Sequence, residues 1–363
     1  MKSPRRGREG GFSLVELAVS LAIVGVVGLA LWRFIPLARQ ISQGSALKDE
    51  LAQAQAATEG FVLRAHRLPC PDTDNDGHEN CAAGALGTLP WRDLGLGATQ
   101  GALRYGVYRA GGHDLAASAL THQAPLLPIG YTVSTTANGL DFCTKLRGAI
   151  TTPGAAGALT AGNVEVAYAL AHPGADGQFQ GLNTLGFDLP GRARDNTYDD
   201  SVVAAGLSEL SGRMACPSRL GEATVAARAA MAAYDIDRDA KQFQEFRDFA
   251  SQVRTTNKNF AAANVGLTIL DLLDATATTA SSVSIAANSV GVGAATVVVA
   301  VAAMLAAIAS QVSADASLAM AIIGELKAQA QATGAAQIKA QTAAALIHAG
   351  NNAVAVDNKG LTP

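Results

Sequence analysis

The sequence predicts an α+β protein built from a long N-terminal helix, a small antiparallel β head and an Ala-rich helical hairpin or bundle. An apolar run with one charge opens the chain, strand-like segments follow, and the last third is rich in alanine. Apolar residues make up 49% of the chain but aromatic residues only 5%, a mixture that suits long helices with shallow packing. We expect the three parts to span residues 12–66, 67–216 and 217–363.

The N-terminal helix is predicted to cross a membrane over residues 12–34. Its apolar run from Phe12 to Trp32 is long enough to span a bilayer as a helix. The Lys- and Arg-rich residues 2–8 precede it and keep the chain start in the cytoplasm, which directs the rest outward. Glu16 is the one charge in the run, and an unpaired carboxylate in hydrocarbon costs several kcal/mol. The run therefore predicts a positive partner for Glu16.

The stretch REGGFSLVELAVSLAIVGVVGLAL resembles the start of type IV prepilins and type II secretion pseudopilins. The resemblance implies that residues 1–11 are a leader, which prepilin peptidase removes after Gly11. It also implies an N-methylated amino group on Phe12, which pairs with Glu16 of a neighbouring pilin subunit. The alternative is a plain membrane anchor in which the glutamate occurs by chance.

The helical pattern continues beyond the apolar run. Five residues line up on one face at steps of four and three, as in a helix: Leu47, Leu51, Ala54, Thr58 and Phe61. Pro36 and Gly44 interrupt the run, so we expect a kink or a locally unwound turn there. The resemblance then implies a pilin-like shape, a long helix that carries a globular head.

An Asp-rich loop opens the head, after Pro69 and Pro71 have ended the helix. Asp72, Asp74 and Asp76 alternate before a glycine, a spacing that Ca²⁺ loops use. An EF-hand would need a glutamate at the twelfth loop position, where this chain has Ala83. We therefore favour a solvated Asx turn and keep a Ca²⁺ site as the alternative. No cofactor is required by the sequence.

The four cysteines fit two disulfides if the head lies in an oxidising compartment. Three pairings are open. We prefer Cys70–Cys81, which brackets the Asp-rich loop, and Cys143–Cys216. The series LPCPDTDNDG, LPWRDLGL and LRYGVYR also resembles a subgroup of prepilin-like proteins with such a loop. The Asp-Trp-Gly sequence that this subgroup carries before LRY is replaced here by GATQGA.

Strand patterns dominate from Leu103 to Leu210. Segments 103–109, 129–136 and 164–172 alternate or are rich in β-branched and aromatic residues, and turn residues follow each one. We expect a small antiparallel sheet packed on the distal half of the first helix.

The C-terminal part is predicted to form helices at about 218–255, 258–285, 288–333 and 335–349. Phe243, Phe246, Ala250 and Val253 lie on one helical face. No charge occurs from Ala275 to Ala314, so this stretch is either a second membrane element or a packed pair of small-residue helices. We prefer the helix pair, because alanine contributes little to insertion.

Composition and motifs argue against enzymes and nucleic-acid binding. The net charge of -3 gives no electrostatic case for nucleic acid. The histidines lack zinc-ligand spacing, and the adjacent Asp199 and Asp200 would face opposite sides of a strand.

We expect a non-enzymatic minor pilin or pseudopilin subunit in the bacterial inner membrane, with its bulk in the periplasm and prepilin peptidase and other pilins as partners. Two alternatives stay open. One is a membrane-anchored periplasmic binding or interaction protein that never polymerises, and the other is a membrane-active protein that acts through its C-terminal helices.

Overall fold

The computed structural model describes residues 13–123, 126–133, 135–195, 197–288 and 294–361, with the side chains of 33–43, 285–288 and 294–295 left out. The chain forms two compact units. The first holds the N-terminal helix and the sheet, and comprises residues 1–123, 134–222 and 358–363. The second comprises residues 124–133 and 223–357.

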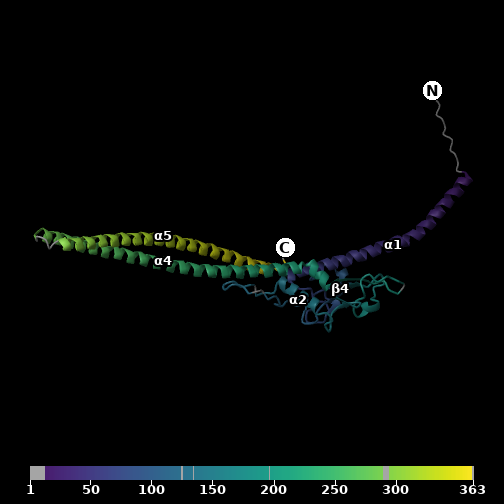
Figure 1. Ribbon diagram of the computed structural model, residues 1–363. Coiled ribbons are helices and arrows are strands. Elements are labelled where there is room, and N and C mark those ends of the chain that lie inside the picture. Colours follow the sequence, from purple (N-terminus) through teal and green to yellow (C-terminus); the bar gives the residue numbers. More distant parts are fainter. Residues whose placement is uncertain (1–12, 124–125, 134, 196, 289–293, 362–363) are drawn as a thin grey trace, which may run out of the picture. The chain divides into compact units, whose positions relative to one another are not determined.

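Helix α1 (Leu14–Ala65) is the predicted long N-terminal helix. It ends where His66 adopts the left-handed conformation, with φ of 57°. The predicted apolar face is confirmed: Leu51, Ala54, Thr58 and Phe61 are buried. The expectation of a locally unwound turn is wrong, because α1 continues through residues 33–44 (Figure 1). One proline removes a single backbone hydrogen bond, and the neighbouring turns can hold the helix together.

The head contains an antiparallel sheet, as predicted. Its strands are β1 (Leu86–Thr88), β2 (Arg104–Val107), β3 (Thr160–Ala161), β4 (Val164–His172) and β5 (Ser201–Gly206). Strand β4 is central, since β2 pairs with one edge and β3 and β5 pair with the other. Tyr105 lies opposite Leu170, and Leu170 lies opposite Val203.

The sheet packs on the distal part of α1, which confirms that expectation. Strand β4 is buried from Val166 to Ala171, and its tyrosine Tyr168 reaches α1. The core continues through Tyr105, Phe142 and Phe187. Burial of these large side chains supplies the main stabilisation of the head.

Two helices in the head were not predicted: α2 (Gly139–Thr151) and α3 (Leu207–Arg213). The stretch from 103 to 210 is therefore not all β. Asn138 caps α2 by accepting a hydrogen bond from the Leu140 N–H at 2.8 Å, while Asp141 accepts one from the Asn138 N–H. This capping box was present in the sequence as a helix signal.

The predicted strand at 129–136 is wrong within the described residues. Residues 131–133 form no strand, and this segment belongs to the second unit. The Tyr131 hydroxyl donates to the Leu346 carbonyl over 3.4 Å. The tyrosine ring also covers Gly350, so the apolar pattern here serves contacts with a helix rather than a sheet.

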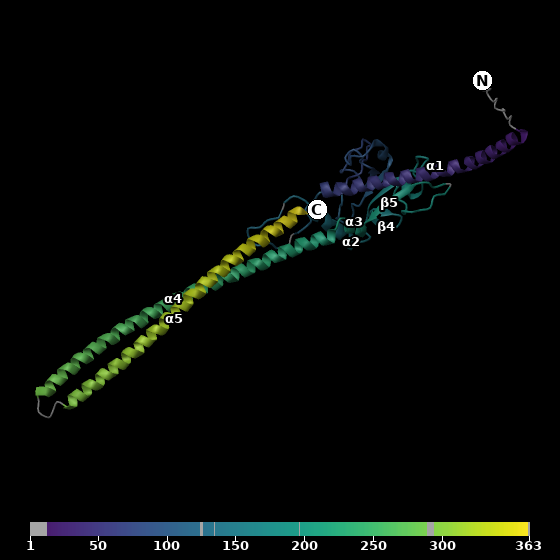
Figure 2. The ribbon, with the colours of Figure 1, turned by 90° about the horizontal axis from the view of Figure 1, so that it is seen from above.

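Two long helices replace the four predicted in the C-terminal part: α4 (Cys216–Asn288) and α5 (Ala294–Lys359). The expected breaks near 256 and 334 are absent, since a glycine such as Gly334 costs a helix only about 1 kcal/mol. The two helices run antiparallel as a hairpin (Figures 1 and 2). The predicted helical face of Phe243, Phe246 and Val253 is exposed in the hairpin.

Side-chain hydrogen bonds fix the register of the hairpin along its length. Near its open end, Thr342 donates to Asp237 over 3.2 Å. Farther along, Lys258 pairs with Glu325 at 2.8 Å, and Thr268 donates to Gln311 over 2.7 Å. These contacts share one antiparallel register, so equal lengths of α4 and α5 face each other.

Candidate functional site

Residues 14–32 of α1 expose their apolar side chains. None of the residues in this candidate membrane span, Leu14–Trp32, is buried. Leu14 and Trp32 are more than four-fifths exposed. Uncovered apolar area of this size is unfavourable in water, so lipid or neighbouring helices must cover it.

Glu16 lies in the first turn of this span and caps its own helix. Its Oε2 accepts a hydrogen bond from the Ser13 N–H at 3.2 Å. In return, Ser13 Oγ accepts from the Val15 N–H at 3.3 Å. Sequence reasoning missed this capping box, although the spacing Ser13-x-x-Glu16 is its signature. Gly11 and Phe12, the predicted processing residues, lie outside the described residues.

The same region carries a recognisable motif. Residues 6–32 match the family described as the prokaryotic N-terminal methylation motif. The N-terminal segment is a prepilin-type methylation motif. The match includes Arg6 and Arg8, Glu16 and the exposed span, and it indicates processing at the N-terminus. A search of curated proteins found no match for the chain.

The motif has consequences for partners and for chemistry. It implies processing by a prepilin peptidase and assembly with other pilins. It also suggests that this prepilin-like chain is a structural subunit rather than an enzyme.

Membrane anchoring involves more than one candidate helix. Among the described residues, three helical stretches are long and apolar enough to cross a membrane by length and composition: Leu14–Trp32, Cys216–Ser284 and Thr296–Lys359. The motif identifies the first as an anchor.

The cysteines of the head pair as the sequence favoured, Cys70 with Cys81 and Cys143 with Cys216. The first bond closes the Asp-rich loop. The second ties α2 to the first residue of α4.

The Asp-rich loop is organised around the carboxylate of Asp72, which is buried. Its Oδ1 accepts from the N–H groups of Asp74 at 3.1 Å and Asn75 at 2.7 Å, and its Oδ2 accepts from the Gly77 N–H at 2.8 Å. Asp76 accepts from the His78 N–H at 2.7 Å. These are the contacts of an Asx turn.

Oxygens of Asp72, Asp74 and Asp76 come within 4.8 Å of one another, so three carboxylates gather in the loop. The donor set nevertheless fits Ca²⁺ poorly. Both Asp72 oxygens already accept backbone N–H groups, and no glutamate stands at the twelfth position. The geometry supports the Asx turn.

Charged side chains anchor this loop to the end of α1. Arg67 and Glu79 form a two-pronged ion pair with distances of 2.7 and 2.5 Å, and Glu79 also accepts from the Cys70 N–H at 3.0 Å. Burial raises the pKa of Glu79, but these hydrogen bonds outweigh it and the pKa is lowered. The hydrogen bond to Asp93, at 2.9 Å, raises the pKa of His78.

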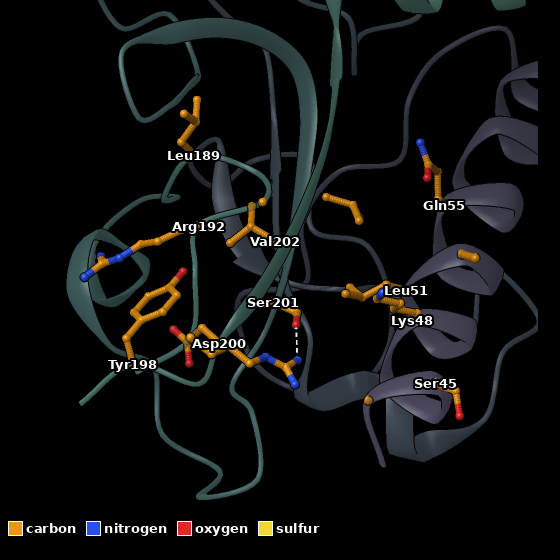
Figure 3. A pocket seen from close by; sticks show the side chains of 15 residues that line it. Ser45, Lys48, Leu51, Gln55, Leu189, Arg192, Tyr198, Asp200, Ser201 and Val202 are labelled. Carbon is orange, nitrogen blue, oxygen red and sulfur yellow. Dashed lines mark hydrogen bonds between the residues drawn. The ribbon is translucent and has the colours of Figure 1, made fainter. Parts of the chain in front are cut away.

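A cavity of about 750 Å³ lies between α1 and β5 (Figure 3). Lys48, Leu51 and Gln55 line it from α1, and Asp200 and Val202 line it from the other side.

Several polar side chains of this cavity bond to their neighbours in the head. Arg192 pairs with Asp188 at 2.9 Å and stacks on the Tyr198 ring, and Arg194 donates to the Ser201 hydroxyl. Asp200 Oδ2 accepts from the Gln180 N–H and from Asn183, each at 2.8 Å. Asp199 instead accepts from the Ala175 N–H at 2.6 Å. These two aspartates hold different turns.

Proposed function

We propose that this prepilin-like protein is a minor pilin or pseudopilin subunit of a type IV pilus or a type II secretion filament. In this proposal, residues 1–11 are the leader and 12–66 the assembly helix. Residues 67–216 form the head and 217–363 the appendage. Cleavage follows Gly11, Phe12 becomes the methylated terminus, and the bulk of the chain lies in the periplasm.

The observation that carries the proposal is one carboxylate at the start of an exposed apolar helix. Glu16 accepts one hydrogen bond, of 3.2 Å, from the uncharged Ser13 N–H. A methylated amino group on a neighbouring subunit would offer it a bond between two opposite charges, which is stronger. Pairing of Glu16 with this amino group would offset the cost of burying the two charges in lipid. It would also set the axial stagger between neighbouring helices.

The hairpin supports a minor rather than a major role. Helices α4 and α5 span 73 and 66 residues, which together nearly equal the head, residues 67–216, in length along the chain. Such an appendage is hard to repeat at every position of a closely packed fibre. A position at a filament tip leaves room for it.

Replacement of Glu16 by alanine tests the proposal. We expect Glu16→Ala to remain in the membrane fraction but to lose co-purification and cross-linking with other pilin-like subunits. Ser13→Ala is the matched control, because it removes the reciprocal cap bond and keeps the carboxylate. Mass spectrometry of the N-terminus should show a methylated Phe12 in both.

Unchanged cross-linking of Glu16→Ala would contradict the proposal. That result would favour a membrane-anchored protein that does not polymerise.

A further inference from the structure

A row of residues on the exposed side of α4 has the spacing of a coiled coil. The row, which we call the α4 seam, follows alternating steps of three and four: Phe243, Phe246, Ala250, Val253, Asn257, Phe260, Asn264 and Leu267. Its five large apolar residues are 41–70% exposed. In the seven-residue repeat abcdefg of a coiled coil, the apolar positions a and d have this spacing and face a partner helix.

The α4 seam is a continuous row along the hairpin, because α4 contacts α5 with the same seven-residue repeat. Asp237, Lys258 and Thr279 lie three heptads apart, and each contacts α5. A helix whose contacts repeat every seven residues winds slightly about its neighbour, so its other heptad positions also form continuous rows. The α4 seam is about 36 Å long at 1.5 Å per residue.

Charged residues flank the α4 seam but do not belong to it. Asp239 precedes the seam at the next heptad position, and Asp271 follows it. The charged residues of α4 between 243 and 267 lie at other positions of the repeat: Glu245, Arg247, Asp248, Arg254 and Lys258. Because a charge buried between helices is costly, this distribution is typical of an interface.

The apolar area along the seam is large enough for a dimer. With about 200 Å² for each side chain, roughly 500 Å² is exposed by four phenylalanines, Phe249 beside the seam and three within it: Phe243, Phe246 and Phe260. A stable interface buries about 800 Å² on each partner. The phenylalanines alone thus supply more than half of that area.

The two asparagines of the seam identify a second copy of α4 as the partner. Asn257 and Asn264 both occupy position a, and both are exposed. An asparagine at position a pairs with the same residue of an identical helix, which fixes the register and the number of chains. An apolar partner would leave these amides without hydrogen bonds once they are buried.

The position of Arg254 favours a parallel orientation of the two copies. In a parallel pair, Arg254 at position e lies beside Phe249 at position g of the other copy, where the guanidinium can stack on the ring. In a fully overlapped antiparallel pair, Arg254 would lie beside Arg254 of the other copy, and like charges repel.

Helix α5 has an exposed row of its own that suits self-pairing less well. The row contains Val298, Val301, Leu305, Ile308, Val312, Asp315, Ala319, Ile322 and Leu326. In a symmetric parallel pair, Asp315 would face the Asp315 of the other copy inside the interface. Two like charges in contact disfavour such a pair.

We propose that two copies of this protein pair through their α4 seams as a parallel coiled coil. Asn257 lies opposite Asn257 of the other copy, and Asn264 lies opposite Asn264. The interface goes beyond the proposed filament role and does not require Glu16.

Cysteine cross-linking of the full chain tests the pairing. Leu267→Cys, in the seam, is compared with Leu273→Cys, which lies off the seam and has a similar exposed fraction, 59% against 60%. Both variants carry Glu16→Ala, so that assembly through α1 does not bring the chains together. The native cysteines are held in disulfides. After oxidation in isolated membranes, we expect severalfold more disulfide-linked dimer at 267 than at 273.

A second substitution tests the role of the asparagines. Asn257→Asp, added to the Leu267→Cys chain, would place two carboxylates opposite each other, so we expect severalfold less linked dimer. Asn259→Asp is the matched control, because Asn259 is exposed and lies off the seam, and it should leave the yield unchanged. Circular dichroism checks that both variants keep their helices.

Five outcomes would overturn the proposal. Equal yields at 267 and 273 would mean non-specific collision, and equal yields with Asn257→Asp and Asn259→Asp would mean that Asn257 does not face its copy. Linkage through Leu326→Cys in place of 267 would assign the contact to α5. Linkage only between Phe243→Cys of one chain and Leu267→Cys of another would mean an antiparallel pair. No linked dimer at any position would mean that lipid or another protein covers the seam.

Discussion

The hydroxyl of Tyr168, on the central strand β4, donates a hydrogen bond of 2.6 Å to the carboxylate of Glu59 on α1. Arg213 of α3 pairs with the same carboxylate at 2.5 Å. One glutamate thus joins the long helix, the sheet and the helix that leads into the hairpin. These two contacts with Glu59 hold the sheet and α3 of the head against α1.

Tyr168→Phe should remove the hydrogen bond to Glu59 without leaving a cavity. A hydrogen bond to a charged group contributes about 1.5–3 kcal/mol, and Glu59 keeps Arg213 as its partner. We expect the free energy of unfolding of the head to fall by about that amount, measured by denaturant titration. Tyr105→Phe is the control within the head, because its hydroxyl donates to the uncharged Pro69 carbonyl at 3.0 Å. Equal losses in the two variants would mean that the Glu59 bond contributes nothing special.

Gly139→Ala should disturb the return of the chain to the head. A methyl group there would come within 2.4 Å of the Leu361 side chain, and overpacking typically costs about 1–3 kcal/mol. We expect faster hydrogen exchange around residues 358–361 and a lower melting temperature. Gly60→Ala is the control, since nothing lies within 4 Å of that position. Unaltered exchange in Gly139→Ala would show that Leu361 is not held there.

Asp72→Asn and Asp74→Asn should separate the two interpretations of the Asp-rich loop. Asp72 accepts three backbone N–H bonds, so its substitution should lower the melting temperature, while the exposed Asp74 should tolerate substitution. Thermal melts with calcium and with a chelator provide the measurement. A calcium-dependent rise in melting temperature that Asp74→Asn abolishes would support a metal loop instead.

The ion pair of Arg67 and Glu79 should make the head sensitive to acid. The pKa of Glu79 is lowered in the folded state, so its stabilising contribution is complete above the unfolded pKa, about 4.3. The contribution is lost as the pH falls through the folded pKa. We expect Glu79→Gln to lower the melting temperature at pH 7. Between about pH 5 and about pH 3, the melting temperature of the variant should fall less steeply than that of the unchanged protein. A parallel decline in the two proteins would count against this.

Much of the fold follows from local patterns in the sequence. The buried face of α1 was readable from Leu51, Ala54 and Thr58, and β4 from its β-branched and aromatic residues. The segment around Tyr131 was misassigned because its partner, Leu346, is distant in sequence. Helix α2 was missed although Asn138 and Asp141 marked its start, because the surrounding strand patterns dominated the interpretation.

The site shows the same division. Glu16 stood out because a carboxylate is rare in an apolar run. Its bond to Ser13 also follows from their spacing, which is that of a capping box. The bonds of Thr276 and Thr278 to carbonyls of their own helix could not be foreseen, because a serine or threonine on a helix can bond either to its own backbone or to solvent.

The constant register of α4 and α5 sets how the hairpin can change in length. Equal deletions of about seven residues, or two helical turns, from both arms between the Thr342–Asp237 contact and the Thr268–Gln311 contact would keep the remaining pairs on facing sides. Each such step would shorten the hairpin by about 10 Å. The length of the hairpin is therefore adjustable in steps of two helical turns, without a change to the contacts at either end.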